Sequence, residues 1–181
     1  MNKPKVKVYI DGANIFYTQQ KLGFSIDWVK IRDYLLEKWE VLEMRYYVGI
    51  KENDEKMNSY LRYLDAIRVS TVTKPLKVIK IDKDHILAKV KNFKEIYKCN
   101  FDVEMTTDIL LDRSMVDEII LFSGDSDFDY LIKKLHDVGK SVTVFSSRKM
   151  ISWELKMSAR KYMFIEDLKI ELSNNKNPRV F

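Results

Sequence analysis

The sequence predicts an α/β domain in which a mainly parallel β-sheet is flanked by helices. Segments with the apolar pattern of strands alternate along the chain with segments of helical spacing. The longest apolar runs have five or six residues, which suits buried strands and is too short to span a membrane. The chain has 181 residues, of which 46% are hydrophobic, enough for a single domain with a substantial core.

The first part of the chain predicts two strands and three helices. Apolar and polar residues alternate before Asp11, as in a strand. Asp27 is a suitable N-cap, and the apolar residues after it recur at helical spacing. The expected elements are a strand over 5–10, a helix after Asn14, a helix over 27–38, a strand over 41–49 and a helix over 53–67.

The middle of the chain is expected to be extended. Residues 69–73 and 76–81 have the composition of strands, and Pro75 between them marks a sheet edge or a bend. Residues 86–93 are expected to pair back as a hairpin across the turn at 82–85.

The second half continues the alternation. Asp102 is a suitable N-cap for its first helix, and Gly139 fits the position just after the second. The expected elements are a helix over 102–113, a strand over 118–122, a helix over 127–138, a strand over 141–145, a helix over 149–161 and a strand over 163–165. We expect one domain over residues 1–172 and a loose polar tail over 173–181.

Charge and composition indicate which kind of partner and which cellular compartment to expect. The formal net charge is +5, a basic surplus that favours a polyanionic partner. The single cysteine, Cys99, allows no internal disulfide and suits a reducing compartment. The N-terminus lacks the apolar core of a secretory signal, so we expect a cytoplasmic protein without a membrane anchor.

Acidic residues follow two of the predicted strands. Asp11 follows the first strand, and Asp125 and Asp127 follow the strand over 118–122 in the sequence Ser-Gly-Asp-Ser-Asp-Phe. Ligands of open parallel sheets bind outside the carboxyl ends of the strands. Carboxylate oxygens are the ligands that Mg²⁺ and Mn²⁺ prefer. The pattern therefore predicts a divalent-metal site shared by two strand ends.

Each acid also has an ordinary structural explanation. Asp11 could belong to a turn, and Asp102 and Asp127 could cap helices. Asp108 could lie on the solvated face of its helix, since acids recur there every four residues. The joint position of Asp11 and Asp125 at strand ends favours the metal site, to which Asn14 would add a neutral oxygen ligand or an orienting amide.

The sequence offers little competing chemistry. It contains no P-loop and no Gly-x-Gly-x-x-Gly pattern, and Cys99 has no partner at zinc-binding spacing. A haloacid-dehalogenase-like phosphatase would need a second Asp where Ala13 stands, and a Toprim-like nuclease would need Glu where Asp11 stands.

Three motifs resemble the NYN domain, most closely its LabA-like group within the PIN-like nuclease superfamily. They are Ile10–Ile15, Lys98–Asp108 and Ser123–Phe128, in the order found in that family. The resemblance covers residues 5–168. It implies a Rossmann-like parallel sheet and an acidic pocket that binds Mg²⁺ or Mn²⁺. It also implies a ribonuclease or another RNA-processing role.

The resemblance also implies roles for single residues. By position, Asp11, Asp102 and Asp125 match the family's metal-binding acids. Asp108 matches a further acid, expected to bind a second ion or to steer water, so that these four acids form the catalytic set. Asn14 and Asp127 match lesser polar positions. Arg160 departs from the pattern, because many relatives carry Asp there.

Further residues are expected to hold the substrate. Ser123 and Ser126 can donate hydrogen bonds near a phosphate. Lys74, which looks like the lysine of the family's central strand, and Lys77 can contact the RNA backbone. The simpler explanation is that these lysines belong to solvated faces. Aromatic residues could stack on unpaired bases, unless they belong to the core. These residues are Tyr46, Tyr47, Tyr60, Tyr63 and Phe93.

Taken together, the residues and the resemblance predict a metal-dependent ribonuclease. Its substrate would be single-stranded or loop RNA, hydrolysed at an acidic Mg²⁺ or Mn²⁺ site. The alternative is a catalytically weak RNA-binding or regulatory module with the same fold. A homodimer is left open.

Overall fold

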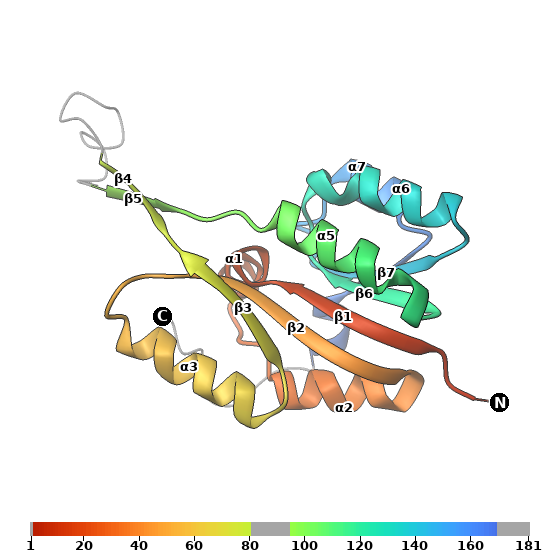
Figure 1. Ribbon diagram of the computed structural model, residues 1–181, viewed down its shortest axis with the longest axis horizontal. Helices are drawn as coiled ribbons and strands as arrows, with labels where there is room; N and C mark the ends of the chain where they lie inside the picture. The colour runs from red at the N-terminus through yellow and green to blue at the C-terminus, as the bar shows by residue number, and fades with distance from the viewer. Residues whose placement is uncertain (1, 81–94, 170–181) are drawn as a thin grey trace.

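The computed structural model describes residues 2–80 and 95–169, and its centre is a sheet of six parallel strands (Figure 1). The strand order is β3-β2-β1-β6-β7-β8. The strands are β1 Lys5–Asp11, β2 Glu40–Ile50, β3 Ser70–Pro75, β6 Glu118–Phe122, β7 Ser141–Ser146 and β8 Lys161–Phe164. From β1 the chain builds outward on one side to β3, and from β6 outward on the other to β8. The topological switch point, where ligands of such sheets bind, therefore lies between β1 and β6.

Helices cover both faces of this sheet. They are α1 Gly12–Leu22, α2 Trp28–Lys38, α3 Glu55–Ala66, α5 Asp102–Asp112, α6 Asp129–Asp137 and α7 Trp153–Ser158. The first three pack on one face and the last three on the other, which gives two hydrophobic cores. Successive residues of a strand point to opposite faces. In β6, Ile120 and Phe122 therefore join the first core, whereas Ile119 and Leu121 join the second. The predicted single α/β domain is confirmed.

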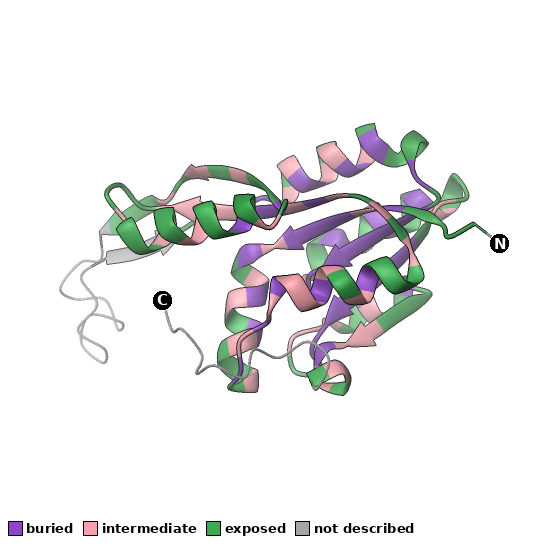
Figure 2. Cartoon of the chain, turned by 90° about the horizontal axis from the view of Figure 1, so that it is seen from below, coloured by how far each residue is buried: buried purple, intermediate pink, exposed green. Residues whose placement is uncertain are grey.

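The central strands are long apolar runs because both of their faces are covered. Every residue of β6 is buried, and β7 is buried from Val142 onward. Figure 2 shows the buried residues concentrated in the sheet, with exposed residues on the outer sides of the helices. Within the described ranges, none of the helices combines the length and the apolarity needed to cross a membrane.

A two-stranded ribbon extends from the sheet. It consists of β4 Lys77–Lys80 and β5 Glu95–Lys98, paired antiparallel, and Figure 1 shows it projecting away from the body of the protein. Pro75 ends β3 at the edge of the sheet, as its missing N–H predicts. The predicted return strand over 86–93 lies outside the described residues, and the described partner of β4 is β5.

Two helix predictions need correction. Asp102 was expected to be an N-cap, but Phe101 holds that position and Asp102 is the first helical residue. The helix expected over 149–161 spans only Trp153–Ser158, because residues 147–152 fold as a loop and Ser152 caps the helix. The caps predicted at Asp27 and Gly139 are confirmed. The predicted tail over 173–181 lies outside the described residues.

Candidate functional site

The carboxyl ends of β1 and β6 are joined by hydrogen bonds between their end residues. Ile10 and Phe122 pair in register, so β1 and β6 end at the same level of the sheet. The Ser123 hydroxyl then donates to Asp11 Oδ2 at 3.0 Å. The Gly124 N–H donates to Asn14 Oδ1, also at 3.0 Å. Residues 110 or more positions apart are thus fixed side by side at the switch point, as the two acid-tipped strands predicted.

Asp11 is held from its own side by the helix that follows. It is the last residue of β1 and the N-cap of α1, and its Oδ1 accepts from the Asn14 N–H at 3.0 Å. The next residue must be glycine, because a Cβ at Gly12 would lie 2.5 Å from the Tyr47 carbonyl oxygen. Burial raises the pKa of Asp11 and the two hydrogen bonds lower it, while the negative charge of Asp125 adds to the rise. The net pKa of Asp11 is raised.

Asp125 is positioned by a compact turn. Its N–H donates to Ser123 Oγ at 3.2 Å, and its Oδ1 accepts from the Asp127 N–H at 3.1 Å. The single-turn helix Ser126–Phe128 follows, and the fully buried Phe128 ring anchors it. Ser126 and Asp127 are exposed at the rim. The turn thus presents a fixed carboxylate next to a solvent-facing hydroxyl and a second carboxylate.

Asp102 reaches the same area from the start of α5. Its N–H donates to Asn100 Oδ1 at 2.8 Å, and the Asn100 amide donates back to Asp102 Oδ2. Burial raises the pKa of Asp102, and the hydrogen bond from Asn100 lowers it. The charges of Asp125, Asp127 and Asp11 raise it further. The net shift is upward, so four carboxylates share one electrostatic environment.

This environment suits a divalent cation by its chemistry. Across the described residues, no three Asp, Glu, His or Cys side chains are grouped closely enough to hold one ion as they stand. Asp11, Asp102 and Asp125 nevertheless offer only hard oxygen donors, the ligands of Mg²⁺ and Mn²⁺. Burial is the main cause of the raised pKa values of Asp11 and Asp102, and repulsion from neighbouring carboxylates adds to the rise; a bound cation would relieve that repulsion.

Comparison with known proteins identifies the family. The family model for the NYN domain matches residues 5–166. The chain belongs to the NYN domain family. It is 27% identical over 179 residues to the low amplitude and bright protein LabA of Synechococcus elongatus, across 98% of this chain and 92% of LabA. A solved structure of a Vibrio parahaemolyticus protein of unknown function has the same fold, with a TM-score of 0.76 and 23% identity, across 96% of this chain and 98% of that one. The resemblance to the LabA-like NYN domain is confirmed.

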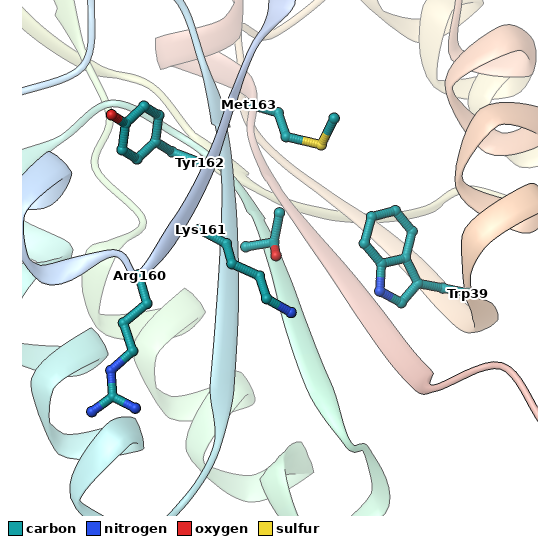
Figure 3. A pocket seen from close by; sticks show the side chains of 6 residues that line it. Trp39, Arg160, Lys161, Tyr162 and Met163 are labelled. Carbon is teal, nitrogen blue, oxygen red and sulfur yellow. The ribbon is translucent and has the colours of Figure 1, made fainter.

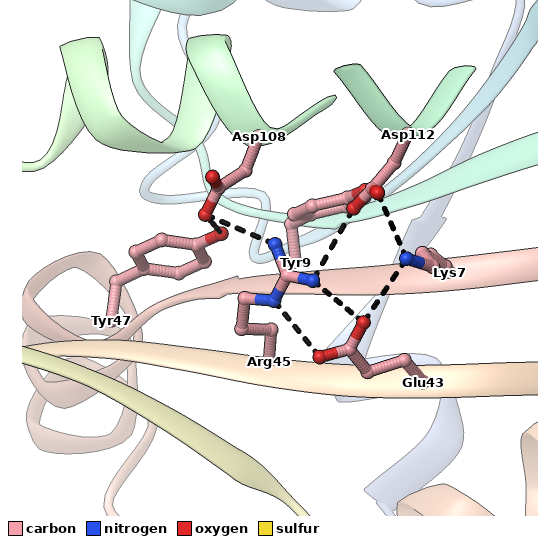
Figure 4. A network of polar contacts seen from close by, with 7 residues as sticks. All are labelled: Lys7, Tyr9, Glu43, Arg45, Tyr47, Asp108 and Asp112. Carbon is pink, nitrogen blue, oxygen red and sulfur yellow. Dashed lines mark hydrogen bonds and ion pairs between the residues drawn. The ribbon is translucent and has the colours of Figure 1, made fainter. Parts of the chain in front are cut away.

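Asp108, the fourth acid expected from the NYN motifs, lies in a different set of contacts. Tyr47 donates to its Oδ2 at 2.7 Å, and the Arg45 guanidinium lies 3.0 Å from the same oxygen (Figure 4). Arg45 also binds Glu43 at 2.6 Å and Asp112 at 3.3 Å. Asp108 therefore ties α5 to β2, and its role in catalysis stays a prediction.

The rest of this network lies between the sheet and α5. Lys7 pairs with Asp112 at 2.9 Å and with Glu43 at 3.2 Å, and Tyr9 donates to Asp112 at 2.9 Å. Burial by itself would raise the pKa of Asp112, but the hydrogen bonds from Lys7 and Tyr9 outweigh it and lower that pKa. The sequence analysis gave Lys7 and Arg45 no role beyond their places in two strands, so it missed this network.

The two lysines expected to bind RNA differ in their contacts. Lys74 forms a 2.6 Å ion pair with Glu104 and lies 4.5 Å from the centre of the Phe101 ring. It therefore fastens β3 to the start of α5, beside Asp102. Lys77 is exposed and lies directly across the ribbon from Lys98. Two like charges in register repel each other, which favours an anion between them.

The aromatic residues expected to stack on bases are mostly engaged elsewhere. Tyr46 and Tyr47 are buried in the two cores, so that expectation is wrong for both. Tyr63 is stacked on Tyr60, with ring centres 6.1 Å apart. Phe93 lies outside the described residues.

Arg160, where many NYN relatives carry Asp, lies away from the acids. It lines an open hollow together with Trp39, Thr143, Lys161, Tyr162 and Met163 (Figure 3). Lys161 begins β8 and pairs with Thr143, three residues before the carboxyl end of β7. The hollow is thus set back along the strands from their acid-bearing ends, and Arg160 removes no carboxylate from the acidic cluster.

Proposed function

We propose that this NYN-domain protein is a metal-dependent ribonuclease that hydrolyses RNA phosphodiester bonds with Mg²⁺ or Mn²⁺. One observation carries the proposal. Asp11 and Asp125, from distant parts of the sequence, are joined at the switch point by the Ser123 hydroxyl, which donates to Asp11 and accepts from the Asp125 N–H. A protein gains little stability from crowding like charges, whereas a metal site requires it. Membership of a family within the PIN-like nuclease superfamily points to the same chemistry.

The roles of the residues follow from their positions. Asp11 and Asp125, locked by Ser123 and by their own turns, would hold the ion, and Asp102 would complete or orient its coordination. When bound, such an ion activates water and neutralises charge on the phosphate. Ser126, exposed at the rim, would donate to a phosphate oxygen. We propose that the catalytic unit spans residues 1–172.

RNA would approach along the ribbon side. Lys77, exposed and opposite Lys98, has the charge and the freedom to pair with phosphates. Lys74 already pairs with Glu104, so we expect it to support α5 and to contact RNA only where that ion pair opens. Asn14 and Asp127 would assist from either side of Asp125. Single-stranded or loop RNA is the proposed substrate.

A second function is favoured by one specific observation. Within the described part of the chain the acids do not converge on a single ion, and Asp102 is already engaged by Asn100. An RNA-binding or regulatory module with weak turnover would have such a site.

An incubation experiment separates the two functions. The purified protein is mixed with labelled single-stranded, hairpin and duplex RNAs in Mn²⁺, in Mg²⁺ and in chelator. The ribonuclease predicts cleavage of the single-stranded and loop segments only when metal is present. RNA binding without cleavage in either metal would favour the regulatory module.

A further inference from the structure

Trp153 is an exposed aromatic side chain without a partner. Its exposed fraction is 69%. Other exposed aromatic rings in the described ranges are engaged: Tyr17 by Phe16, Tyr130 by Lys134 and Tyr162 by Phe164. The Trp153 side chain has no hydrogen bond or ring contact with any described residue. A single exposed ring is ordinary on a protein surface, so the case for a ligand here depends on what surrounds Trp153.

The position of Trp153 ties it to the acidic site. It follows Ser152, whose N–H donates to the Gly124 carbonyl at 2.8 Å. Gly124 directly precedes Asp125, and standard bond lengths then keep the Cα atoms of Trp153 and Asp125 within about 11 Å of each other. A short piece of single-stranded nucleic acid spans that distance.

Hydrogen bonds hold the backbone around Trp153 in place. Met150 and Ile151 donate to the Ser147 carbonyl at 3.1 and 3.0 Å, and Ser152 caps α7 through the Leu155 N–H. The loop lies so close to Gly124 that a Cβ there would be 2.4 Å from the Met150 carbonyl oxygen. The Trp153 ring is therefore presented from a fixed backbone, which keeps the entropy cost of binding low.

Charge around Trp153 favours a nucleic acid over an apolar partner. Lys149, four residues earlier in the same loop, is exposed and has no ion pair with any described residue. Neighbouring Arg148 is already paired with Asp167 at 2.7 Å. A free cation and a free ring beside a carboxylate site match the phosphate and the base of a nucleotide.

We propose that Trp153 stacks on an unpaired base of single-stranded RNA while Lys149 pairs with a neighbouring phosphate. The inference rests on the proposed function, because it places this base next to the phosphodiester held at Asp125. Stacking needs only the flat face of a base, so the subsite accepts single strands of any sequence and excludes duplexes, whose bases already stack on each other.

Binding is measured in chelator, where no cleavage occurs. Fluorescein-labelled decaadenylate is titrated with the parent, Trp153→Ala, Trp153→Phe and Leu111→Ala, and anisotropy gives each Kd. Trp153→Ala is expected to raise Kd about tenfold or more, the usual effect of losing one base–aromatic stack. Trp153→Phe should recover most of the affinity. Leu111, equally exposed on α5, is the matched control, and its loss should leave Kd unchanged.

An abasic probe adds a direct test of stacking. A decaadenylate that lacks the stacked adenine base should bind the parent more weakly than the intact probe does. The Trp153→Ala protein should bind both probes equally, as expected when the base and the ring interact with each other. Thermal melts confirm that each variant is folded.

Several results would overturn the inference: equal Kd values for the parent and Trp153→Ala, an equal loss in Leu111→Ala, or no binding by the parent. Self-association that Trp153→Ala abolishes would instead assign this face to a second copy of the chain. RNA binding that depends on Trp153 without cleavage in any metal would refute the ribonuclease and leave this inference standing. A cleavage rate that is the same in the parent and in Trp153→Ala would refute this inference and leave the proposed ribonuclease standing.

Discussion

Replacing Asp102 by Asn should stabilise the metal-free protein and weaken its response to metal. The side chain is partly exposed at the start of α5, and an amide oxygen can still accept from Asn100. The raised pKa of Asp102 means that the folded state disfavours its charge. An uncharged side chain of the same shape therefore removes a destabilising interaction at neutral pH.

The sign of the pH dependence follows from the same shift. Above the raised folded-state pKa of Asp102, its charge destabilises the fold, and this penalty disappears as the pH falls through that pKa toward the ordinary value of 3.8. The stability advantage of Asp102→Asn is thus largest at neutral pH and shrinks on acidification. Asp65→Asn, at an exposed site on α3, changes the same charge and serves as the control.

The expected rise in Tm follows from the free energy of metal binding. A cation that binds only the folded protein adds about 2.7 kcal/mol of stability at a hundred times its Kd. For a domain of this size, that raises Tm by about 5–10 °C. Calorimetric scans in chelator and in Mn²⁺ should show this rise in the parent and in Asp65→Asn, and a smaller one in Asp102→Asn. Equal rises in all three proteins would refute the assignment of Asp102 as a ligand.

Three further predictions concern the surroundings of the site. Arg45→Met removes the cation that Glu43, Asp108 and Asp112 share, leaving Lys7 to pair with two of them, and should cost about 3 kcal/mol in urea unfolding; an unchanged midpoint would contradict this. Gly124→Ala brings a Cβ to 2.4 Å from a carbonyl oxygen and should cost about 1–3 kcal/mol, whereas unaltered stability would mean that the loop yields freely. Replacing Lys77 and Lys98 by Ala should flatten the salt dependence of RNA binding by about one unit of slope per lost phosphate contact, and an identical slope would return both to ordinary surface lysines.

The strand ends were predictable because their signals are local. A buried run that stops at Asp11 and another that stops before Asp125 determine where those carboxylates lie once the sheet is parallel. The bonds that join them, from Ser123 to Asp11 and from Gly124 to Asn14, connect distant residues. Periodicity within one segment does not indicate such pairings.

The errors share a physical cause, which is contact between distant segments. Tyr47 reads as available for stacking, but β2 lies between two neighbouring strands and its faces are covered. The sequence analysis assigned no contact to Arg45, because the residues that bind it, Asp108 and Asp112, are brought to it by α5 from more than sixty positions away. The helix expected to begin at residue 149 starts at Trp153, because the preceding loop bonds to Gly124.

The central claim is that Asp125 holds a catalytic metal ion, and its most direct test is the cleavage rate of Asp125→Asn. The amide is nearly isosteric and keeps an oxygen that can accept from the Asp127 N–H. Single-turnover cleavage of a single-stranded RNA in Mn²⁺ should fall about a hundredfold or more, the usual cost of losing one essential transition-state interaction. RNA binding and the cleavage rate of Asp65→Asn should stay at parental values. An Asp125→Asn protein that cleaves as fast as its parent would contradict the account.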